Sequence, residues 1–286
     1  MVCLVSSFSH FLSCTIAGVP RSAMRSVLLF YLSYLLCLCL GIVCVVFVCY
    51  WNNTWRGGFA WDGTALQFNW HPVLMVTGLV VLYGNAAVVY RIPLTWGQNK
   101  QPWKLLHAGL LFLAFFLSVL GLCAVFDYHK KGGIPNLYSL HSWLGMCTTV
   151  LFTAQWVLGS GAFLVPWSPM AFRKILKPVH VWMGSVIFVL GIASLSTIFL
   201  WPGPYSKLPP EAVFANSLGI LIVVFGLVVL KILSNPEWQR PEPGPDDEST
   251  AGTVLHLCKN YRTTFMQIKK KSFSVPLFTL SNPKRI

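Results

Sequence analysis

Four histidines, His71, His107, His141 and His180, each stand near the start of a long apolar stretch of the sequence. A polar group without a partner costs several kcal/mol inside a membrane, so four such residues need a chemical reason. If successive stretches form antiparallel helices, His71 and His141 lie near one membrane face and His107 and His180 near the other. At about 1.5 Å per residue and about 30 Å of bilayer core, we expect the two levels roughly 20 Å apart.

A pair of facing imidazoles suits few metal centres. Zinc usually takes three or four ligands, often with Cys, Asp or Glu among them. Two imidazoles across a gap fit the axial positions of a haem, which is then six-coordinate and suited to electron transfer. Gly145 and Gly184 each follow a histidine by four residues and could leave room for a porphyrin, although ordinary helix packing also explains many membrane glycines. The residues therefore favour two b-type haems held among the second, third, fourth and fifth helices.

The elements that must position these histidines are membrane helices. The chain has 286 residues, 55% hydrophobic and only 10% charged, which excludes an ordinary soluble domain. A helix needs about 20 apolar residues to cross a bilayer. Six stretches are long enough, namely 27–51, 71–90, 104–126, 140–165, 179–201 and 212–233. We expect an all-α transmembrane six-helix bundle over 27–235, an N-terminal extension over 1–26 and a disordered tail over 236–286.

Basic residues collect on one side of this predicted bundle. They are Arg21, Arg25, Arg91, Lys100, Lys104, Arg173, Lys174, Lys177, Lys231 and Arg240. Because lysine and arginine are enriched in cytosolic loops, we expect both termini to be cytosolic. The formal net charge of +13 comes partly from the basic tail. Such a tail usually faces anionic lipid, so we do not predict a nucleic-acid partner.

Basic side chains near His107 and His180 could bind a small organic anion. They are Arg91, Lys100, Lys104 and Arg173, although cytosolic topology alone would also place basic residues there. On the other side, His129, Asn136 and Tyr138 precede His141 and could hold a polar reductant or a metal ion, or could form a solvated loop. The Asn-Asn-Thr motif at Asn52 matches a glycosylation acceptor.

The sequence around each histidine resembles the cytochrome b561 family. The segments are FNWHPVLM at 68–75, KLLHAGL at 104–110, NLYSLHSWLG at 136–145 and KPVHVWMG at 177–184. They are similar to the four haem-ligand segments of that family, and the resemblance covers roughly residues 55–240. The stretches YWNNTWRGGFAWDGT and LPPEAVFANSLG are most similar to its lysosomal, ascorbate-dependent member.

The resemblance implies a role for each candidate residue. His71 and His141 match the ligands of a lumenal haem, and His107 and His180 match those of a cytosolic haem. Residues that match a cytosolic ascorbate site are Arg91, Lys100, Lys104 and Arg173. Residues that match the lumenal substrate site are His129, Asn136 and Tyr138.

The family's activity gives the expected function. It oxidises cytosolic ascorbate and reduces ferric iron or monodehydroascorbate across the membrane, typically as a homodimer, and the lysosomal member works in late endosomes and lysosomes. The chain departs from the family in a short 199–211 segment and in a tail without an acidic dileucine signal. An alternative of another class is a histidine-based divalent-metal transporter, which would need acidic residues along its path. Before residue 236 only Asp62, Asp127 and Glu211 are acidic.

Overall fold

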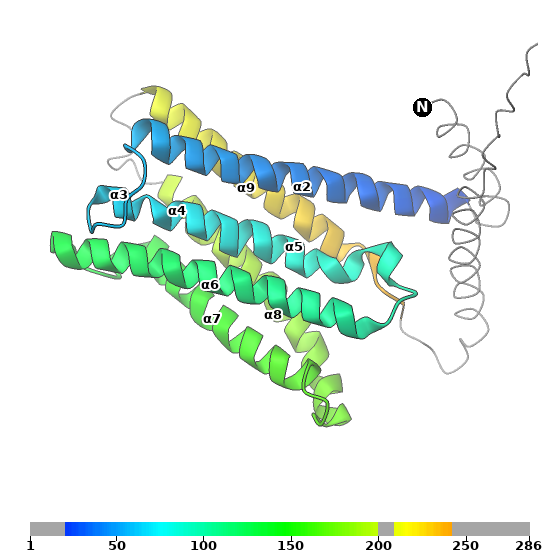
Figure 1. Cartoon of the computed structure of the whole chain (residues 1–286). Helices are drawn as coiled ribbons and strands as arrows, with labels where there is room; N and C mark the ends of the chain where they lie inside the picture. Colours follow the sequence, from blue (N-terminus) through cyan, green and yellow to red (C-terminus); the bar gives the residue numbers. More distant parts are fainter. Residues whose placement is uncertain (1–20, 200–208, 242–286) are drawn as a thin grey trace, which may run out of the picture. The chain divides into compact units, whose positions relative to one another are not determined.

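The computed structural model of the protein describes residues 21–199 and 209–241, and every regular element in those residues is a helix (Figure 1). The second span is built from α3 (Ala65–Phe68), α4 (Trp70–Met75), the π-helix η2 (Val76–Leu82), α5 (Tyr83–Val88) and the 3-10 helix η3 (Val89–Arg91). The long single helices are α2 (Arg21–Trp55), α6 (Lys100–Gly132), α7 (Leu140–Phe163), α8 (Met170–Phe199) and α9 (Pro209–Ser234). The short 3-10 helices η4 (Pro93–Thr95) and η6 (Pro236–Trp238) complete the list. All the long helices belong to one compact unit, whereas Leu94–Gln98 belongs to a second.

Five stretches of described helix are long and apolar enough to cross a membrane. They are Ser22–Trp55, Ala65–Arg91, Lys100–Gly132, Met170–Thr197 and Pro210–Ser234. The remaining long helix, α7, has 24 residues and is not among these five; it carries Thr148, Thr149, Thr153 and Gln155 in its middle. The threonine hydroxyls donate to carbonyls one turn back in their own helix, which satisfies them without water.

Several helices are longer than the apolar stretches predicted them to be. α6 begins at Lys100, where the Asn99 side chain accepts from the N–H of Gln101, and it ends at Gly132, with Gly133 as its C-cap. Gly133 has φ 63° and its N–H bonds to the carbonyl of His129. His129 therefore lies in the last turn of α6, although the predicted apolar stretch ends at residue 126. Helical hydrogen bonding continues through the polar residues that flank an apolar core, and hydropathy does not record this.

α8 begins at Met170, not near residue 179, so His180 lies well inside the helix and not in its first turn. Pro178 lies within α8 and removes one backbone donor just before His180. The preceding helix, α7, begins where predicted, with Ser139 as its N-cap and a capping box formed with Ser142. His141 is accordingly in the first turn of α7, as the sequence predicts.

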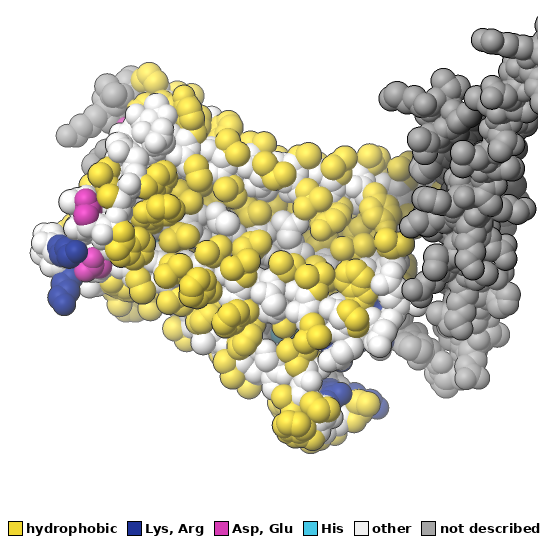
Figure 2. All heavy atoms as spheres, in the orientation of Figure 1, with side chains coloured by type: hydrophobic (Ala, Val, Ile, Leu, Met, Phe, Trp, Pro, Cys, Tyr) yellow, Lys and Arg dark blue, Asp and Glu magenta, His cyan; other side chains and the backbone are white. Residues whose placement is uncertain are grey.

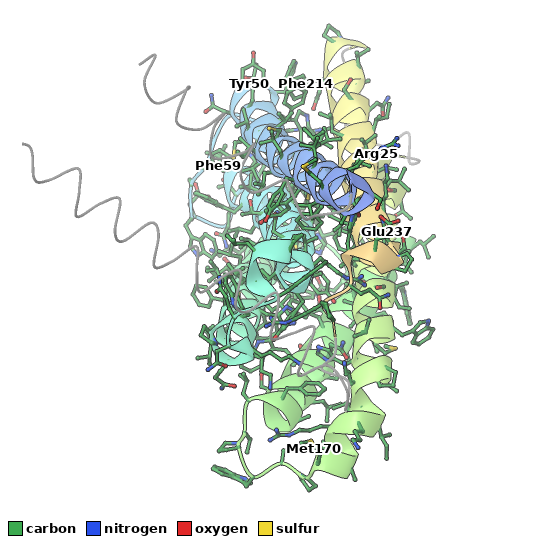
Figure 3. The ribbon with its side chains drawn as sticks, turned by 90° about the vertical axis from the view of Figure 1, so that its right-hand side faces the viewer. Arg25, Tyr50, Phe59, Met170, Phe214 and Glu237 are labelled. Carbon is green, nitrogen blue, oxygen red and sulfur yellow. The ribbon has the colours of Figure 1, made fainter. Side chains whose placement is uncertain are left out.

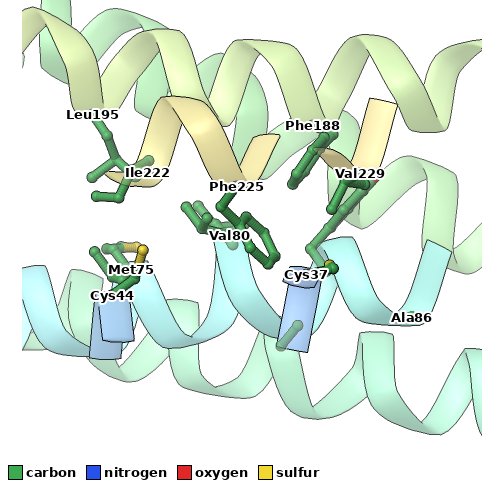
Figure 4. Close-up of a cluster of buried hydrophobic side chains, with 14 of the residues drawn as sticks. Cys37, Cys44, Met75, Val80, Ala86, Phe188, Leu195, Ile222, Phe225 and Val229 are labelled. Carbon is green, nitrogen blue, oxygen red and sulfur yellow. The ribbon is translucent and has the colours of Figure 1, made fainter. Parts of the chain in front are cut away.

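The bundle core lies between packed pairs of helices, some consecutive in the chain and one, α2 with α9, distant in sequence. α7 packs along α8, α2 packs along α9, and the second span packs against α6. Figure 4 shows Phe225 of α9 between Val80 of η2 and Phe188 of α8, all of them buried. In the interface between α2 and α9, Tyr50 lies against Phe214, with ring centres 5.5 Å apart (Figure 3).

The flank of the bundle is apolar and the charges lie at its ends. Figure 2 shows hydrophobic side chains along the helices on one face, with the visible charged side chains gathered at the two ends of the helices. Leu28, Leu35 and Ile42 of α2 are each more than half exposed. An apolar band of this kind is unfavourable in water and is what a lipid bilayer requires.

Residues on both sides of the predicted domain boundaries pack into the bundle. The Ser26 hydroxyl donates to Glu237 at 2.6 Å, and the buried Trp238 indole donates to the Ser26 carbonyl at 3.2 Å. Trp238 also makes an edge contact with Phe30, with ring centres 5.6 Å apart. The packed unit thus extends outside the predicted limits of 27 and 235. The rest of the predicted extension and tail, 1–20 and 242–286, lies outside the described residues.

Asn52, the predicted glycosylation acceptor, is buried in this fold. Asn52 belongs to the last turns of α2 and its side chain is 1% exposed. Its amide nitrogen donates to the carbonyl of Val48 at 2.7 Å. A side chain that is buried and hydrogen-bonded in a helix cannot carry a glycan without local unfolding.

Candidate functional site

The four histidines form two facing pairs. The rings of His71, on α4, and His141, on α7, have centres 6.0 Å apart and planes at 89°. The rings of His107, on α6, and His180, on α8, have centres 6.3 Å apart and planes at 67°. The structure thus brings together the histidines that the alternation of helices predicts to meet. We refer below to the His71 end and the His107 end of the bundle.

The two pairs lie at different depths in the bundle. The Nδ1 of His71 lies 3.1 Å from the carbonyl oxygen of Gly121, which places that residue of α6 at the level of the first pair. His107, of the second pair, is itself on α6. The fourteen residues from His107 to Gly121 correspond to about 21 Å along a helix. This agrees with the separation expected from the sequence.

Three of the four imidazoles are held by a backbone carbonyl of a different helical span. The bonds run from His71 to Gly121 at 3.1 Å, from His107 to Ala86 at 2.8 Å and from His141 to Ser194 at 2.9 Å. A carbonyl oxygen only accepts, so Nδ1 carries the hydrogen in each of these rings. The lone pair is then on Nε2. A ring fixed in this tautomer by a carbonyl is the usual arrangement of a metal-binding histidine.

The spacing of each pair fits a haem iron. A metal bound at about 2 Å by two facing imidazole nitrogens holds the ring centres about 6 Å apart. The observed spacings are 6.0 and 6.3 Å. The described residues contain no group of three or more His, Cys, Asp or Glu side chains that could bind a metal ion directly. The donor set at each level is two neutral imidazoles, which is the set of a bis-histidine haem.

Ser194 gives His141 a second contact besides the carbonyl bond. The Ser194 hydroxyl lies 3.2 Å from Nδ1 of His141 and donates to the His141 carbonyl at 3.0 Å. A Cβ at Gly145 would lie 3.3 Å from that hydroxyl. Gly145 therefore faces α8 and permits its close approach. Gly184 likewise faces neighbouring helices, since a Cβ there would lie 3.6 Å from the Gln155 amide. The packing explanation of these two glycines is favoured over room for a porphyrin.

Three of the predicted anion-binding residues lie close together at the His107 end. The ammonium of Lys104 donates to the carbonyl of Phe163, the last residue of α7, at 3.3 Å. Arg173 donates to the carbonyls of Val165 and Pro166, at 2.7 and 3.1 Å, in the chain that follows α7. Lys104 is also within electrostatic range of Arg173 and Lys100. The ring of Phe163 lies 5.3 Å from that of His180, so the cluster adjoins the second histidine pair.

The fourth predicted residue, Arg91, has a different environment. Its guanidinium donates to the carbonyl of Asn235 at 3.2 Å and to that of Leu233. It therefore binds the otherwise unpaired carbonyls at the end of α9, where a positive charge is also favourable. The structure does not bring Arg91 into contact with the other three cations by any of these bonds.

Tyr90 lies near His107 and Arg240 interacts with Tyr90, and neither was predicted as a site residue. The ring centre of Tyr90 is 5.5 Å from that of His107. Arg240 interacts electrostatically with Tyr90, and burial lowers the pKa of its guanidinium. Hydropathy gives no signal for Arg240 because it follows α9 outside any apolar stretch. The sequence analysis includes Arg240 among the basic residues on the cytosolic side, but it does not indicate that Arg240 interacts with Tyr90.

At the His71 end the structure joins two of the three predicted substrate residues. His129 Nδ1 and Asn136 Oδ1 lie 2.9 Å apart, whereas the Tyr138 side chain is 70% exposed. Three residues that were not predicted as site residues lie in the same region. The Gln67 amide donates to Asp127 at 2.9 Å, and Asp127 pairs with Lys131 at 3.0 Å.

Asp62 is a further carboxylate at the His71 end. The N–H and the hydroxyl of Thr64 bond to it at 2.9 and 2.7 Å. These bonds, with a contribution from Lys131, hold the pKa of the Asp62 carboxyl below its usual range.

Fold and site together define a membrane protein, helical throughout the regular elements of its described residues, with two histidine pairs at two depths. The family model for eukaryotic cytochrome b561 matches residues 70–200. The lysosomal membrane ascorbate-dependent ferrireductase of Danio rerio is 64% identical over 236 residues, which are 78% of this chain and 96% of that protein. The Homo sapiens protein of the same name is 54% identical and covers 75% and 93% of the two chains. The plasma membrane ascorbate-dependent reductase of Xenopus laevis is 40% identical, with 87% and 93% covered.

The chain belongs to the cytochrome b561 family. Membership in this family implies binding of b-type haem, and the paired imidazoles fit that group.

Proposed function

We propose that this protein transfers electrons across a membrane, from ascorbate on the cytosolic side to ferric iron on the lumenal side. The observation that carries the proposal is the presence of two facing histidine pairs at two depths of one bundle. Relatives 54–64% identical to the chain are named ascorbate-dependent ferrireductases, which supports this donor and this acceptor.

His71 with His141, and His107 with His180, would hold two b-type haems, the first pair on the lumenal side and the second on the cytosolic side. A haem with two imidazole ligands is six-coordinate, so it transfers electrons without binding a substrate at iron. The carbonyls of Gly121, Ala86 and Ser194 keep three of the rings oriented with Nε2 available. The bundle itself excludes water from the space between the pairs, where Tyr83, Phe152 and Phe188 are buried.

We further propose that α7 is the sixth membrane span. It packs along α8, itself long and apolar enough to span, and its polar side chains are paired within the bundle, as in the bond from Gln155 to the His180 carbonyl. Six spans put both termini on one side. The concentration of lysine and arginine at the His107 end supports the cytosol as that side.

Ascorbate is an anion at neutral pH, and Lys100, Lys104 and Arg173 form a cationic cluster next to His180 that would attract it. Arg91 would contribute to the same field from the end of α9. Each ascorbate monoanion that is oxidised to its radical gives up one electron and one proton. Each ferric ion that is reduced takes one electron, so two ascorbate anions support the reduction of two ferric ions.

The ferric substrate would bind on the lumenal side near His129, Asn136 and Tyr138. The contact between His129 and Asn136 supports a shared polar site there. The names of the relatives also support a place in the lysosomal membrane, and the family resemblance adds the late endosomal membrane. We include a homodimer in the proposal on the basis of the family resemblance alone.

A visible absorption spectrum of the detergent-purified protein tests the proposal. We expect two haems per chain and a sharp reduced band on addition of ascorbate. Proteoliposomes loaded with a ferric chelate should then form ferrous iron inside when ascorbate is added outside to protein in the matching orientation. A colourless protein, or one haem that does not respond to ascorbate, would refute the proposal.

A further inference from the structure

His180 is held differently from the other three histidines. Its ring makes no hydrogen bond to any described residue, whereas the Nδ1 of each other ring bonds to a carbonyl. The ring instead lies against the backbone of α7, where a Cβ at Gly159 would be 2.7 Å from Cε1 of His180. It also contacts the ring of Phe163 at 5.3 Å. Something other than a bond to the ring must therefore set its position.

The backbone of α8 just before His180 lacks one of its helical hydrogen bonds. Pro178 has no N–H, so the carbonyl one turn before it is without its helical donor. A helix with a missing bond bends more easily at that point. The imidazole moves with the backbone that carries it, since only two torsions separate the ring from Cα.

Two side chains from other spans bind α8 just after this weak point. The amide nitrogen of Gln155, on α7, donates to the carbonyl of His180 at 2.6 Å. The hydroxyl of Tyr83, on α5, donates to the carbonyl of Gly184 at 2.9 Å. Each carbonyl oxygen has a second lone pair, so these bonds add to the helical ones.

Gly184 permits both contacts. A Cβ at this position would lie 3.6 Å from the Gln155 amide nitrogen and 3.8 Å from the Tyr83 hydroxyl. Both polar groups therefore lie over the bare backbone of the same turn of α8. Tyr83 is 4% exposed and packs between Phe152 and Phe188, with ring centres 5.0 and 5.8 Å away. Gln155 and Tyr83 thus hold α8 from two directions.

We propose that Gln155 and Tyr83 are positioning residues that act through the backbone of α8 to set the orientation of the His180 imidazole. The inference rests on the proposed role of His180 as a haem ligand. It makes the two haem sites unequal, because both rings of the His71–His141 pair are held by direct carbonyl bonds, whereas the ring of His180 has no such bond.

The test uses the full-length holoprotein and the variants Gln155→Leu and Tyr83→Phe. The first removes the amide donor at similar volume, and the second removes only the hydroxyl and keeps the ring. Thr153→Val is the matched control, since it lies two residues from Gln155 on α7 and its hydroxyl bonds only within that helix, to Thr149. Haem retention, the low-spin electron paramagnetic resonance signal of each haem and the midpoint potential of each haem are measured.

We expect the parent to show two distinct low-spin signals. Each variant should shift the signal and the potential of one haem and leave the other unchanged, and Thr153→Val should match the parent. Loss of a partner that orients a metal ligand typically weakens retention of the group by about 10- to 100-fold. Selective loss of one haem from Gln155→Leu, with the other signal intact, would therefore also support the proposal.

Variants with both signals and potentials equal to those of the parent would overturn it. Loss or equal disturbance of both haems in Tyr83→Phe would also overturn it, because the effect would not be confined to the His180 site. A parent protein without two haem signals would refute the proposed function itself, so the two failures are distinguishable.

Discussion

Substitution of Gly159 by alanine should selectively disrupt the haem site at the His107 end. The new Cβ would lie 2.7 Å from Cε1 of His180, whereas ordinary van der Waals contact begins near 3.4 Å. The imidazole would have to retreat by about 0.7 Å, which exceeds the tolerance of about 0.5 Å for a functional constellation. Overpacking of this kind costs about 1–3 kcal/mol. That range corresponds to a loss of haem affinity at this site of about 5- to 150-fold, if the strain falls on the liganded state.

The assay measures how much haem each chain retains on dilution, or in competition with a haem-free protein that binds haem. Absorption gives the total haem, and the separate electron paramagnetic resonance signals give the haem at each site. We expect Gly159→Ala to lose the haem of the His107 end first and to keep the other. Gly161→Ala is the control, because a Cβ at Gly161, two residues further on in α7, meets nothing within 4 Å. Equal retention of both haems by Gly159→Ala and Gly161→Ala would refute the argument that the His180 ring is confined against α7.

Lys104→Ala should raise the KM for ascorbate several-fold with little change in kcat, because it weakens attraction of the anion; the difference from the parent should shrink at high ionic strength. Ser194→Ala should disturb the haem of the His71 end alone, measured by its resonance signal, since the hydroxyl adjoins His141 and is remote from His180. Glu211→Gln should lower the free energy of unfolding in detergent by about 3 kcal/mol, measured by thermal or denaturant unfolding, because the Arg56 guanidinium 2.8 Å away would lose its counter-charge in a largely buried site. A change below about 0.5 kcal/mol would show that water already screens this pair. Thr54→Ala, which destroys the only acceptor motif around the end of α2, should leave the electrophoretic mobility and its response to an N-glycosidase unchanged.

The membrane helices and the pairing of the histidines could be predicted from the sequence. A stretch of about 20 apolar residues must form a spanning helix because lipid cannot satisfy the backbone in any open conformation. Alternating helices then place His71 near His141 and His107 near His180, whatever the details of packing. The helix ends were predicted less well, as the early start of α8 shows, because polar residues at an interface extend a helix without any apolar signal.

The partners of the histidines could not be predicted. Every residue but proline presents the same backbone groups, so nothing in the sequence marks Gly121, Ala86 or Ser194 as the acceptor for a ring 21 to 53 residues away. The same holds for the bonds from Gln155 and Tyr83 to α8, which depend on the register between helices. Arg91 shows the converse case. Its charge is evident in the sequence, but its bonds to the carbonyls of Leu233 and Asn235 are not, because these residues are 142 and 144 positions away and meet Arg91 only in the folded bundle.

The sequence by itself therefore determined that the chain crosses a membrane and that imidazoles meet in pairs at two depths, because hydropathy and helix alternation are properties of the chain order. Only the tertiary structure decided how each imidazole is held, which cations lie near His180 and which cation, Arg91, instead binds the carbonyls at the end of α9. Those outcomes depend on contacts of a few ångströms between backbone groups of different spans, and the order of residues along the chain does not encode them in any local pattern.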